Sequence, residues 1–252
     1  MKILTGKKQT PRRCLLYGVH GIGKSTWAAQ APNVLMMDLE DGLADIDCSR
    51  TEVVKDLLHA REIIEWLRSE KHEFRTLVID SADWLEQLVH KYVAEQAGKK
   101  TIGDIPYSAG YKTAEAIWRN ILDQLNMLRD DRGVAVILTA HSNINRFTNP
   151  AGDSYDRYEP ALHKSSSALV QQWADEVFFA SYRVNVTKKD EGFGKTRAVA
   201  TGGEQRYIRC QENATAYAKN RLAMPAEIDF SFEAYREAIA ASRQTTKQEG
   251  AE

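Results

Sequence analysis

A glycine-rich segment near the N-terminus restricts the chain to folds in which a strand enters a helix through a phosphate-binding loop. Residues 18–25 have the sequence Gly-Val-His-Gly-Ile-Gly-Lys-Ser and match the pattern G-x-x-x-x-G-K-[ST]. Residues 14–17 before it are apolar and predict a buried strand, and residues 25–31 predict the first turns of a helix. A glycine-rich turn with a chance lysine would not need these flanking elements, so the segment predicts a nucleoside triphosphate site.

The pattern also gives individual side chains a role at this site. Glycines let the backbone wrap so that successive N–H groups face the phosphates, and the helix N-terminus adds the positive end of its dipole. Lys24 is predicted to reach the β- and γ-phosphates, and the hydroxyl of Ser25 is predicted to ligate Mg²⁺. The expected cofactors are ATP and Mg²⁺, and the expected nucleotide-binding residues are Gly18, Gly21, Ile22, Gly23, Lys24, Ser25 and Thr26.

Length, charge and cysteine content narrow the class of protein. A chain of 252 residues can hold one large α/β domain or two small ones. The net charge of −1 provides no general attraction to nucleic acid or membranes, so contact with DNA would need a local basic patch. Cys14, Cys48 and Cys210 form no C-x-x-C pair, which favours a reducing compartment over a structural metal. The lack of a signal peptide or a long apolar run predicts a cytoplasmic protein without a membrane partner.

Apolar runs of strand length alternate with amphipathic stretches from residue 13 onward. This alternation is typical of βαβ units and predicts an α/β fold with a mainly parallel sheet flanked by helices. Strands are expected at residues 14–17, 34–38, 76–80 and 134–140, with a short one at 51–54. Helices are expected at residues 55–70, 82–97 and 112–129, where apolar residues recur with helical spacing.

The remaining segments differ from this pattern. Residues 98–110 and 143–163 predict loops, and loops of this length inside a domain are usually functional or mobile. Residues 175–186 and 196–210 alternate as antiparallel strands do, with a turn at 188–195, and a last helix is expected at 232–242. The predicted organisation is a flexible basic arm at 1–12, a single domain at 13–244 and a polar tail at 245–252.

Carboxylates that follow two predicted strands are candidates for metal binding and catalysis. Asp80 ends an apolar strand, where an aspartate beside a phosphate loop would hold the water shell of Mg²⁺. Asp83 lies close by and is predicted to cap the next helix. Glu40 follows the strand at 34–38, at the edge of the sheet where ligands bind, so it is a candidate for the base that orients the attacking water. A solvated acidic turn formed by Asp38, Glu40 and Asp41 is the alternative.

These motifs together resemble the core of RecA-type recombinases. Asp38-Leu39-Glu40 follows the second strand, and Val78-Ile79-Asp80-Ser81 follows the third. The resemblance implies a RecA-like P-loop NTPase core with Glu40 as the catalytic base. Typical AAA+ proteins carry an acidic residue beside the metal-binding aspartate, where this chain has Ser81. His141 ends the fourth strand, where RecA-like cores have a polar residue, often glutamine, that senses the γ-phosphate. A satisfied surface histidine is the alternative.

The same resemblance implies contacts with DNA and with a neighbouring subunit. The loops at 98–110 and 143–163 occupy the places of the RecA-type DNA-binding loops, although such loops are also common as lids or protein contacts. The segment 219–221 resembles a Lys-Asn-Arg segment of RadA-like and DnaB-like relatives whose basic residues reach the next subunit's nucleotide, with a basic surface turn as the alternative. The expected DNA-binding residues are Tyr107, Tyr111, Lys112, Arg146, Phe147, Arg157 and Lys164, with Tyr155 and Tyr158 as further candidates for stacking on bases.

The features from about residue 13 to 229 resemble small phage-encoded ATPases with an AAA-type domain, some of which are Sak-type single-strand annealing proteins. The resemblance implies ATP hydrolysis coupled to single-stranded DNA binding in phage recombination, inside a bacterial host cell. It also implies a ring or filament of copies and a phage or host single-strand-binding protein as a further partner. A helicase loader or protein-remodelling ATPase, a small-molecule phosphotransferase and a nucleotide-gated switch are the alternatives. The expected catalytic residues are Glu40, Lys24, His141, Lys219 and Arg221.

Overall fold

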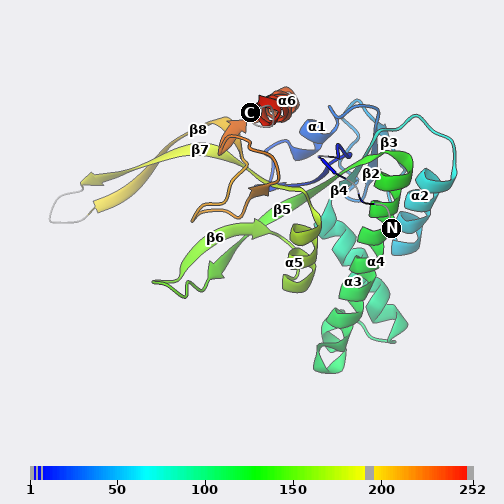
Figure 1. Cartoon of the computed structure of the whole chain (residues 1–252). Coiled ribbons are helices and arrows are strands. Elements are labelled where there is room, and N and C mark those ends of the chain that lie inside the picture. The colour runs from blue at the N-terminus through cyan, green and yellow to red at the C-terminus, as the bar shows by residue number, and fades with distance from the viewer. Residues whose placement is uncertain (1–2, 4, 7, 191–195, 249–252) are drawn as a thin grey trace.

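The computed structural model describes residues 3, 5–6, 8–190 and 196–248 of the chain. Ten strands within these residues form one sheet in the order β10-β8-β7-β1-β5-β4-β2-β3, with β6 paired to β5 and β9 to β7 (Figure 1). The strands are β1 (Arg13–Gly18), β2 (Val34–Asp38), β3 (Ser49–Arg50), β4 (Thr76–Asp80), β5 (Ala135–Phe147), β6 (Tyr155–Pro160), β7 (Glu176–Asp190), β8 (Thr196–Arg209), β9 (Lys219–Asn220) and β10 (Glu227–Asp229). The helices are α1 (Lys24–Ala28), α2 (Leu57–Ser69), α3 (Ala82–Gln96), α4 (Ala109–Arg132), α5 (Lys164–Trp173) and α6 (Phe232–Gln248), with short 3₁₀ helices η1 (Ile102–Asp104) and η2 (Pro106–Ser108).

The centre of the sheet is parallel. β1 pairs in parallel with β5 on one side and with β7 on the other, and β4 pairs in parallel with β5 and β2. β5 therefore lies between the phosphate-loop strand β1 and β4, and the carboxyl ends of these strands meet at one edge of the sheet. Antiparallel pairs β7–β8, β8–β10 and β5–β6 extend this centre. The structure confirms a mixed α/β fold with a mainly parallel sheet and an antiparallel extension.

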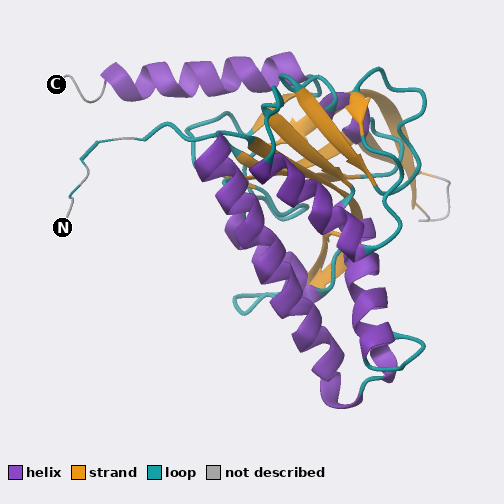
Figure 2. Ribbon diagram, turned by 90° about the vertical axis from the view of Figure 1, so that its right-hand side faces the viewer, coloured by secondary structure: helices purple, strands orange, loops and turns teal. Residues whose placement is uncertain are grey.

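Helices cover both faces of the sheet, because the side chains of its buried strands alternate between the two faces. On one face Leu15 and Tyr17 of β1 belong to a cluster with residues of α2, α3, α4 and α5. On the other face Cys14 and Leu16 pack with Trp27 of α1 and with residues of α6. Figure 2 shows α6 along the face of the sheet opposite the long helices. The phosphate loop is thus anchored by a strand that is buried from both sides.

The structure confirms the four main predicted strands and three predicted helices, with changes at their ends. The short strand expected at 51–54 is wrong, because β3 is Ser49–Arg50 and the following backbone bonds to β2 only through the N–H groups of Thr51 and Val54. α2 begins after Asp56, whose side chain accepts a hydrogen bond from the backbone N–H of His59. α6 continues to Gln248, past the predicted end at residue 242.

Residues 143–163 do not form the predicted loop. β5 continues past His141 to Phe147, and the chain returns as β6, so most of this segment is an antiparallel hairpin. Its outer residues are largely exposed, without the apolar alternation that marks a half-buried strand. Two further segments differ from the prediction: residues 98–110 contain η1 and η2, and α5 has no counterpart among the predicted helices. Of the turn expected at 188–195, residues 191–195 lie outside the described residues.

Candidate functional site

The phosphate loop lies at the carboxyl edge of the sheet, between β1 and the short helix α1. Gly18 ends β1 beside β7, and a Cβ atom on it would lie 2.3 Å from the backbone oxygen of Ala180, so only glycine fits there. Gly21 and Gly23 have φ angles of 71° and 98°, a left-handed conformation that glycine adopts without steric cost. Backbone geometry therefore requires all three glycines, and a loop of this kind can turn its N–H groups toward a phosphate.

Lys24 is buried beneath this loop, with 7% of its surface exposed. Its Nζ donates hydrogen bonds to the backbone oxygens of Gly18 and Val19, both at 3.2 Å. Burial lowers the pKa of Lys24, while the carboxylates of Asp83, Asp80 and Glu40 favour its charged form. The phosphate loop and the carboxylates of the site therefore surround one ammonium group.

Asp80 ends β4 and is buried. The hydroxyl of Thr139 on β5 donates a hydrogen bond to Oδ1 of Asp80. Because β5 lies between β4 and β1, this threonine joins the aspartate to the strand beside the phosphate loop. Ser25 and Asp80 offer hydroxyl and carboxylate oxygens, the hard ligands that Mg²⁺ prefers, so the available donor atoms fit the predicted metal.

Glu40 lies in the turn after β2. Asp38 ends that strand in register with Asp80, and its Oδ1 accepts the N–H groups of Glu40 at 3.2 Å and Gly42 at 3.4 Å. The hydroxyl of Ser81 donates a hydrogen bond to Oε1 of Glu40. Burial raises the pKa of Glu40, against the lowering effects of Ser81 and His141. This is not the solvated acidic turn that was the alternative: buried Asp38 shapes the turn, and the Glu40 carboxylate meets the end of β4.

His141 stands next to Gly18 in the register of β5 with β1. Its backbone N–H donates to Oδ1 of Asp83 at 3.0 Å, and its ring Nδ1 lies 2.8 Å from Oδ2 of the same carboxylate. The ring also stacks on His20 of the phosphate loop, with centroids 4.0 Å apart. The hydrogen bond with Asp83 raises the pKa of His141, while burial lowers it. The prediction that Asp83 caps the next helix is wrong, because Ser81 is the N-cap residue of α3 and the Asp83 carboxylate binds His141 instead.

The predicted DNA-binding residues lie on several elements, and they differ in exposure. Tyr107 is 97% exposed between α3 and α4, and Lys112 and Lys164 are exposed on α4 and α5. Tyr111 instead stacks on His163, with ring centroids 4.3 Å apart. The first three side chains are open to a partner, whereas the ring of Tyr111 already has one within the chain.

Arg157 of the β5–β6 hairpin is engaged within the domain. It forms ion pairs with Glu159 and Glu212, both at 2.8 Å, and its side chain is only 11% exposed. Its guanidinium lies over the ring of Phe147 at 4.3 Å from the centroid. The ring of Tyr158 stacks on an aromatic ring of β7. These contacts engage the side chains of Arg157 and Tyr158 within the domain.

Lys219 and Arg221 lie near the amino ends of the parallel strands, opposite the carboxyl ends that carry the phosphate loop. β9 pairs with the start of β7 at Glu176, which is level with Cys14 at the start of β1, whereas the phosphate loop follows the end of β1. Arg221 lies 3.5 Å from Asp175, and Nζ of Lys219 donates to a backbone oxygen of α5 at 3.5 Å. The structure therefore does not bring these two residues to the phosphate loop of the same chain.

Arg206 of β8 is a residue of the site that sequence reasoning missed. Its Nη1 donates to the backbone oxygen of Ile22 at 3.0 Å, and its guanidinium lies 5.0 Å from the ring centroid of Phe230. No local signal marks this residue, because the contact joins segments that are far apart in sequence. Thr139 and Ser81 were missed as partners of the carboxylates for the same reason.

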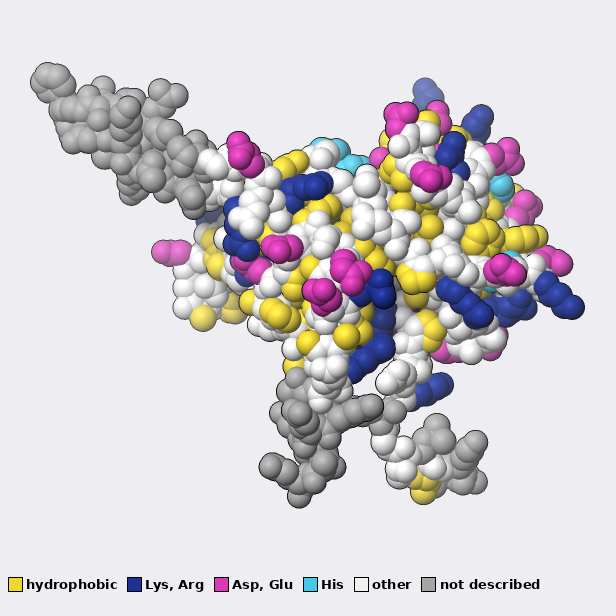
Figure 3. All heavy atoms as spheres, turned by 90° about the horizontal axis from the view of Figure 1, so that it is seen from above, with side chains coloured by type: hydrophobic (Ala, Val, Ile, Leu, Met, Phe, Trp, Pro, Cys, Tyr) yellow, Lys and Arg dark blue, Asp and Glu magenta, His cyan; other side chains and the backbone are white. Residues whose placement is uncertain are grey.

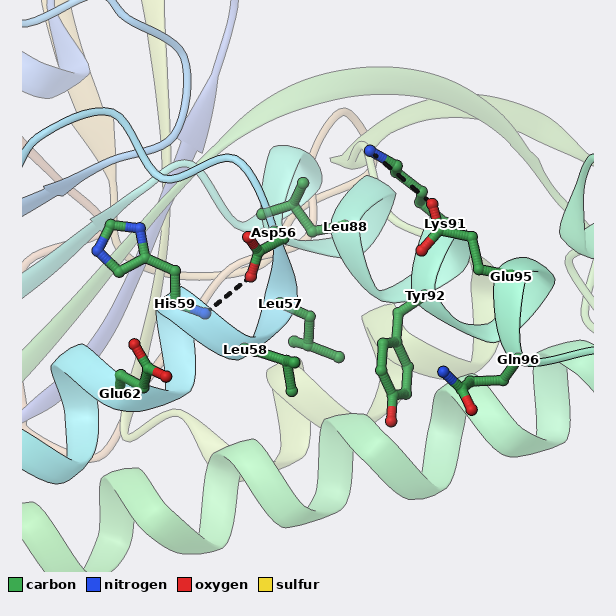
Figure 4. Close-up of a pocket in the computed structure, with 10 residues that line it drawn as sticks. All are labelled: Asp56, Leu57, Leu58, His59, Glu62, Leu88, Lys91, Tyr92, Glu95 and Gln96. Atoms are coloured by element: carbon green, nitrogen blue, oxygen red, sulfur yellow. Dashed lines mark hydrogen bonds and ion pairs between the residues drawn. The ribbon is translucent and has the colours of Figure 1, made fainter.

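A pocket of about 430 Å³ lies away from these residues, between the start of α2 and the second half of α3 (Figure 4). Leu58, Leu88 and Tyr92 line it together with the ion pair of Lys91 and Glu95. None of its described lining residues belongs to the predicted site. The pocket is therefore separate from the phosphate loop.

The phosphate loop, the aspartate at the end of β4 and the mainly parallel sheet define a P-loop ATPase. A family model described as an AAA domain matches residues 10–222, and the chain belongs to this AAA domain family. Membership implies use of a nucleotide, usually with Mg²⁺. A comparison with curated proteins gave no match. Within the described ranges, no helix combines the length and apolar character needed to span a membrane.

Proposed function

We propose that the protein is a RecA-like, Mg²⁺-dependent ATPase that couples hydrolysis to single-stranded DNA binding in phage recombination or strand annealing. The position of Glu40 carries this proposal. Its carboxylate comes from the turn after β2 and bonds to Ser81, the residue directly after Asp80. A glutamate supplied by the neighbouring strand is the arrangement that the RecA resemblance implies, and Ser81 leaves no second acidic residue beside Asp80.

The residues of the site have separate tasks in hydrolysis. Lys24 and the N–H groups of the loop stabilise charge on the phosphates, which supplies most of the catalysis in phosphoryl transfer. Glu40 orients the attacking water and accepts its proton, a task favoured by the raised pKa of its half-buried carboxyl group. Ser25 and Asp80 would hold Mg²⁺, which when bound would supply positive charge at the phosphates. His141 contacts the terminal phosphate from the point of β5 that lies beside Gly18.

Two antiparallel hairpins support a role for a large partner. β5–β6 continues from His141, and β7–β8 continues from the strand beside Gly18 (Figure 1). Both hairpins are therefore continuations of strands, β5 and β7, that pass beside the phosphate loop. Together with the exposed Tyr107, Lys112 and Lys164, they offer aromatic and basic groups that suit a single strand, in which every base has a stacking face.

The positions of Lys219 and Arg221 support a homo-oligomer. A cation that helps hydrolysis must reach the phosphates, and these two lie away from the phosphate loop of their own chain. A ring or filament would place them at the nucleotide of the next copy, so that hydrolysis depends on assembly. A phage or host single-strand-binding protein is a further proposed partner.

A protein partner is the second candidate, and it fits an ATP-driven loader or remodelling ATPase. Arg146 is paired with Asp156 at 3.4 Å, while Ile144 and Val184 on the two hairpins are 63% and 50% exposed. Basic and acidic side chains are also interspersed on the face shown in Figure 3. Paired charges beside exposed apolar residues suit a protein surface better than a phosphate backbone.

Steady-state ATP hydrolysis with and without an oligo(dT) strand tests the proposal. Lys24→Ala should remove hydrolysis under both conditions. Stimulation of the wild type by single strands, reduced in the double variant Tyr107→Ala/Lys164→Ala and kept in the surface variant Lys91→Ala, would support DNA coupling. Binding should also weaken as salt rises, because contacts with phosphates release counterions. Hydrolysis that does not respond to DNA would refute this coupling and favour the protein partner.

A further inference from the structure

Helix α3 carries two carboxylates one turn apart, directly after the metal-binding strand β4. Asp83 accepts the backbone N–H of His141 at 3.0 Å, and Glu86 accepts the backbone N–H of His163 at 2.8 Å. These histidines stand at the two ends of the segment that forms the β5–β6 hairpin. α3 therefore holds both ends of the hairpin, and only the Asp83 end touches the nucleotide site.

Asp83 makes a second contact that Glu86 does not make. Its Oδ2 lies 2.8 Å from Nδ1 of His141, so one carboxylate holds both the backbone and the imidazole ring of His141. Because the Asp83 carboxylate accepts hydrogen bonds from both the backbone and the ring of His141, the ring has little freedom to turn. With Nδ1 engaged, Nε2 is the ring nitrogen that remains for another partner.

The imidazole ring lies among the groups that handle phosphate. It stacks on His20 of the phosphate loop at 4.0 Å between centroids, with an angle of 19° between the ring planes. Nδ1 of His141 lies 3.9 Å from Oε1 of Glu40. The charged or titratable groups that face the ring are thus Asp83 from α3, Glu40 after β2, Lys24 from α1 and His20 from the loop.

We propose that Asp83 is a positioning residue for ATP hydrolysis, because it holds the His141 ring so that Nε2 can donate a hydrogen bond to the terminal phosphate. The inference rests on the proposed ATPase function and assigns to Asp83 a role that acts through His141. The Asp83 hydrogen bond and the charge of Glu40 favour the imidazolium form of His141, against burial and Lys24. A charged donor strengthens a hydrogen bond to phosphate oxygen.

The arrangement also links the nucleotide to the hairpin. A phosphate that binds His141 would act on the first residues of the hairpin through the Asp83 hydrogen bonds. Glu86 holds the other end at His163, and its burial keeps that end in place. Glu86 thus fixes the hairpin at His163, whereas the position of the hairpin at His141 would depend on the bound nucleotide.

Asp83→Asn tests the proposal, with Glu86→Gln as the matched control on the same helix. An asparagine keeps one acceptor oxygen but turns an NH₂ group toward the second donor of His141, so the ring loses an anchor. We expect kcat to fall by about 10-fold to 100-fold, as for other small misplacements of catalytic groups, with little change in KM. The alkaline limb of kcat should move to lower pH, because the hydrogen bond that raises the pKa of His141 is lost. Glu86→Gln should change neither kcat nor this limb.

Two further measurements test the role of Asp83. In the background of His141→Gln, Asp83→Asn should add little loss of kcat, because both changes remove the same interaction. Nitrogen-15 spectra of the histidine rings, assigned with His141→Gln, should show Nδ1 of His141 protonated at neutral pH in the wild type and its titration shifted to lower pH in Asp83→Asn. An unprotonated Nδ1, an unchanged titration, or full additivity of the two losses would overturn the role of Asp83. A wild-type chain that does not hydrolyse ATP would overturn the proposed function, whereas the ring spectra still test the contact by themselves.

Discussion

Asp175→Asn is expected to destabilise the domain, because it breaks a buried ion pair at the start of the phosphate-loop strand. Nη2 of Arg13 lies 2.8 Å from Oδ1 of Asp175, Nε lies 3.2 Å from Oδ2, and the two side chains are 12% and 6% exposed. Losing one partner of such a pair costs about 3–5 kcal/mol. Asn126 still accepts from Arg13, and the new asparagine keeps one acceptor, so we expect a loss of about 2–3 kcal/mol.

Thermal unfolding at neutral pH measures this loss. For a chain of 252 residues the unfolding entropy is about 0.5 kcal/mol per kelvin, so Tm should fall by about 5 °C. The control is Asp156→Asn, which breaks an ion pair with Arg146 whose side chains are 61% and 64% exposed; a loss below about 0.5 kcal/mol is expected.

The difference in stability between the wild type and Asp175→Asn should depend on pH in a definite direction. Although burial raises the pKa of Asp175, the hydrogen bond and charge of Arg13 outweigh it, and the net pKa lies below its ordinary value. The stabilisation is therefore complete above the unfolded pKa of about 3.9 and disappears as pH falls through the lower folded value. The gap between wild type and Asp175→Asn should be constant from neutral pH to about pH 5 and close in stronger acid. Equal Tm shifts for both variants, or a gap that persists in acid, would refute the reasoning.

Three further outcomes follow from the site. Glu40→Gln should lower kcat by about 100-fold or more while a fluorescent ATP analogue still binds, because the water loses its base; unchanged hydrolysis would exclude Glu40 from that role. Gly18→Ala should lower the midpoint of urea unfolding, since its Cβ would lie 2.3 Å from the backbone oxygen of Ala180, whereas Gly42→Ala has nothing closer than 4.0 Å and should be neutral. A midpoint equal for both variants would contradict this. Arg221→Ala should stop hydrolysis, and mixing it with Lys24→Ala should restore part of the activity, because the intact residues then meet across subunits; no recovery on mixing would argue against a cation from the neighbouring copy.

Much of the fold could be predicted because its central strands are buried on both faces. The residues of β2 and β4 are buried throughout, so each strand appears in the sequence as a continuous apolar run. The β5–β6 hairpin could not be predicted in this way, because its exposed outer part lacks any apolar period. The contacts that hold the hairpin are between its own two strands and between Arg157 and Glu212, which lies in a distant segment of the chain.

The residues of the candidate site also fall into two groups, those that local motifs predict and those that only tertiary contacts reveal. Lys24, Ser25 and Asp80 were predicted from motifs whose spacing is local, and Glu40 was selected by its place after a strand and by the RecA resemblance. Asp83 was assigned to the wrong task, because a carboxylate in the first turn of a helix usually serves that helix. Its actual partner, His141, is 58 positions away in sequence.

The sequence by itself determined the phosphate loop, the alternation of strands and helices and the strand-end carboxylates, because each depends on residues that are close neighbours in the chain. Tertiary structure alone decided that β5 lies between β1 and β4, which sets Thr139 against Asp80 and His141 beside Gly18. It also placed Ser81 against Glu40, and it placed Arg221 near the amino ends of the parallel strands, away from the phosphate loop. Strand order and side-chain pairing arise from packing between distant segments, and local composition does not encode which segments will meet.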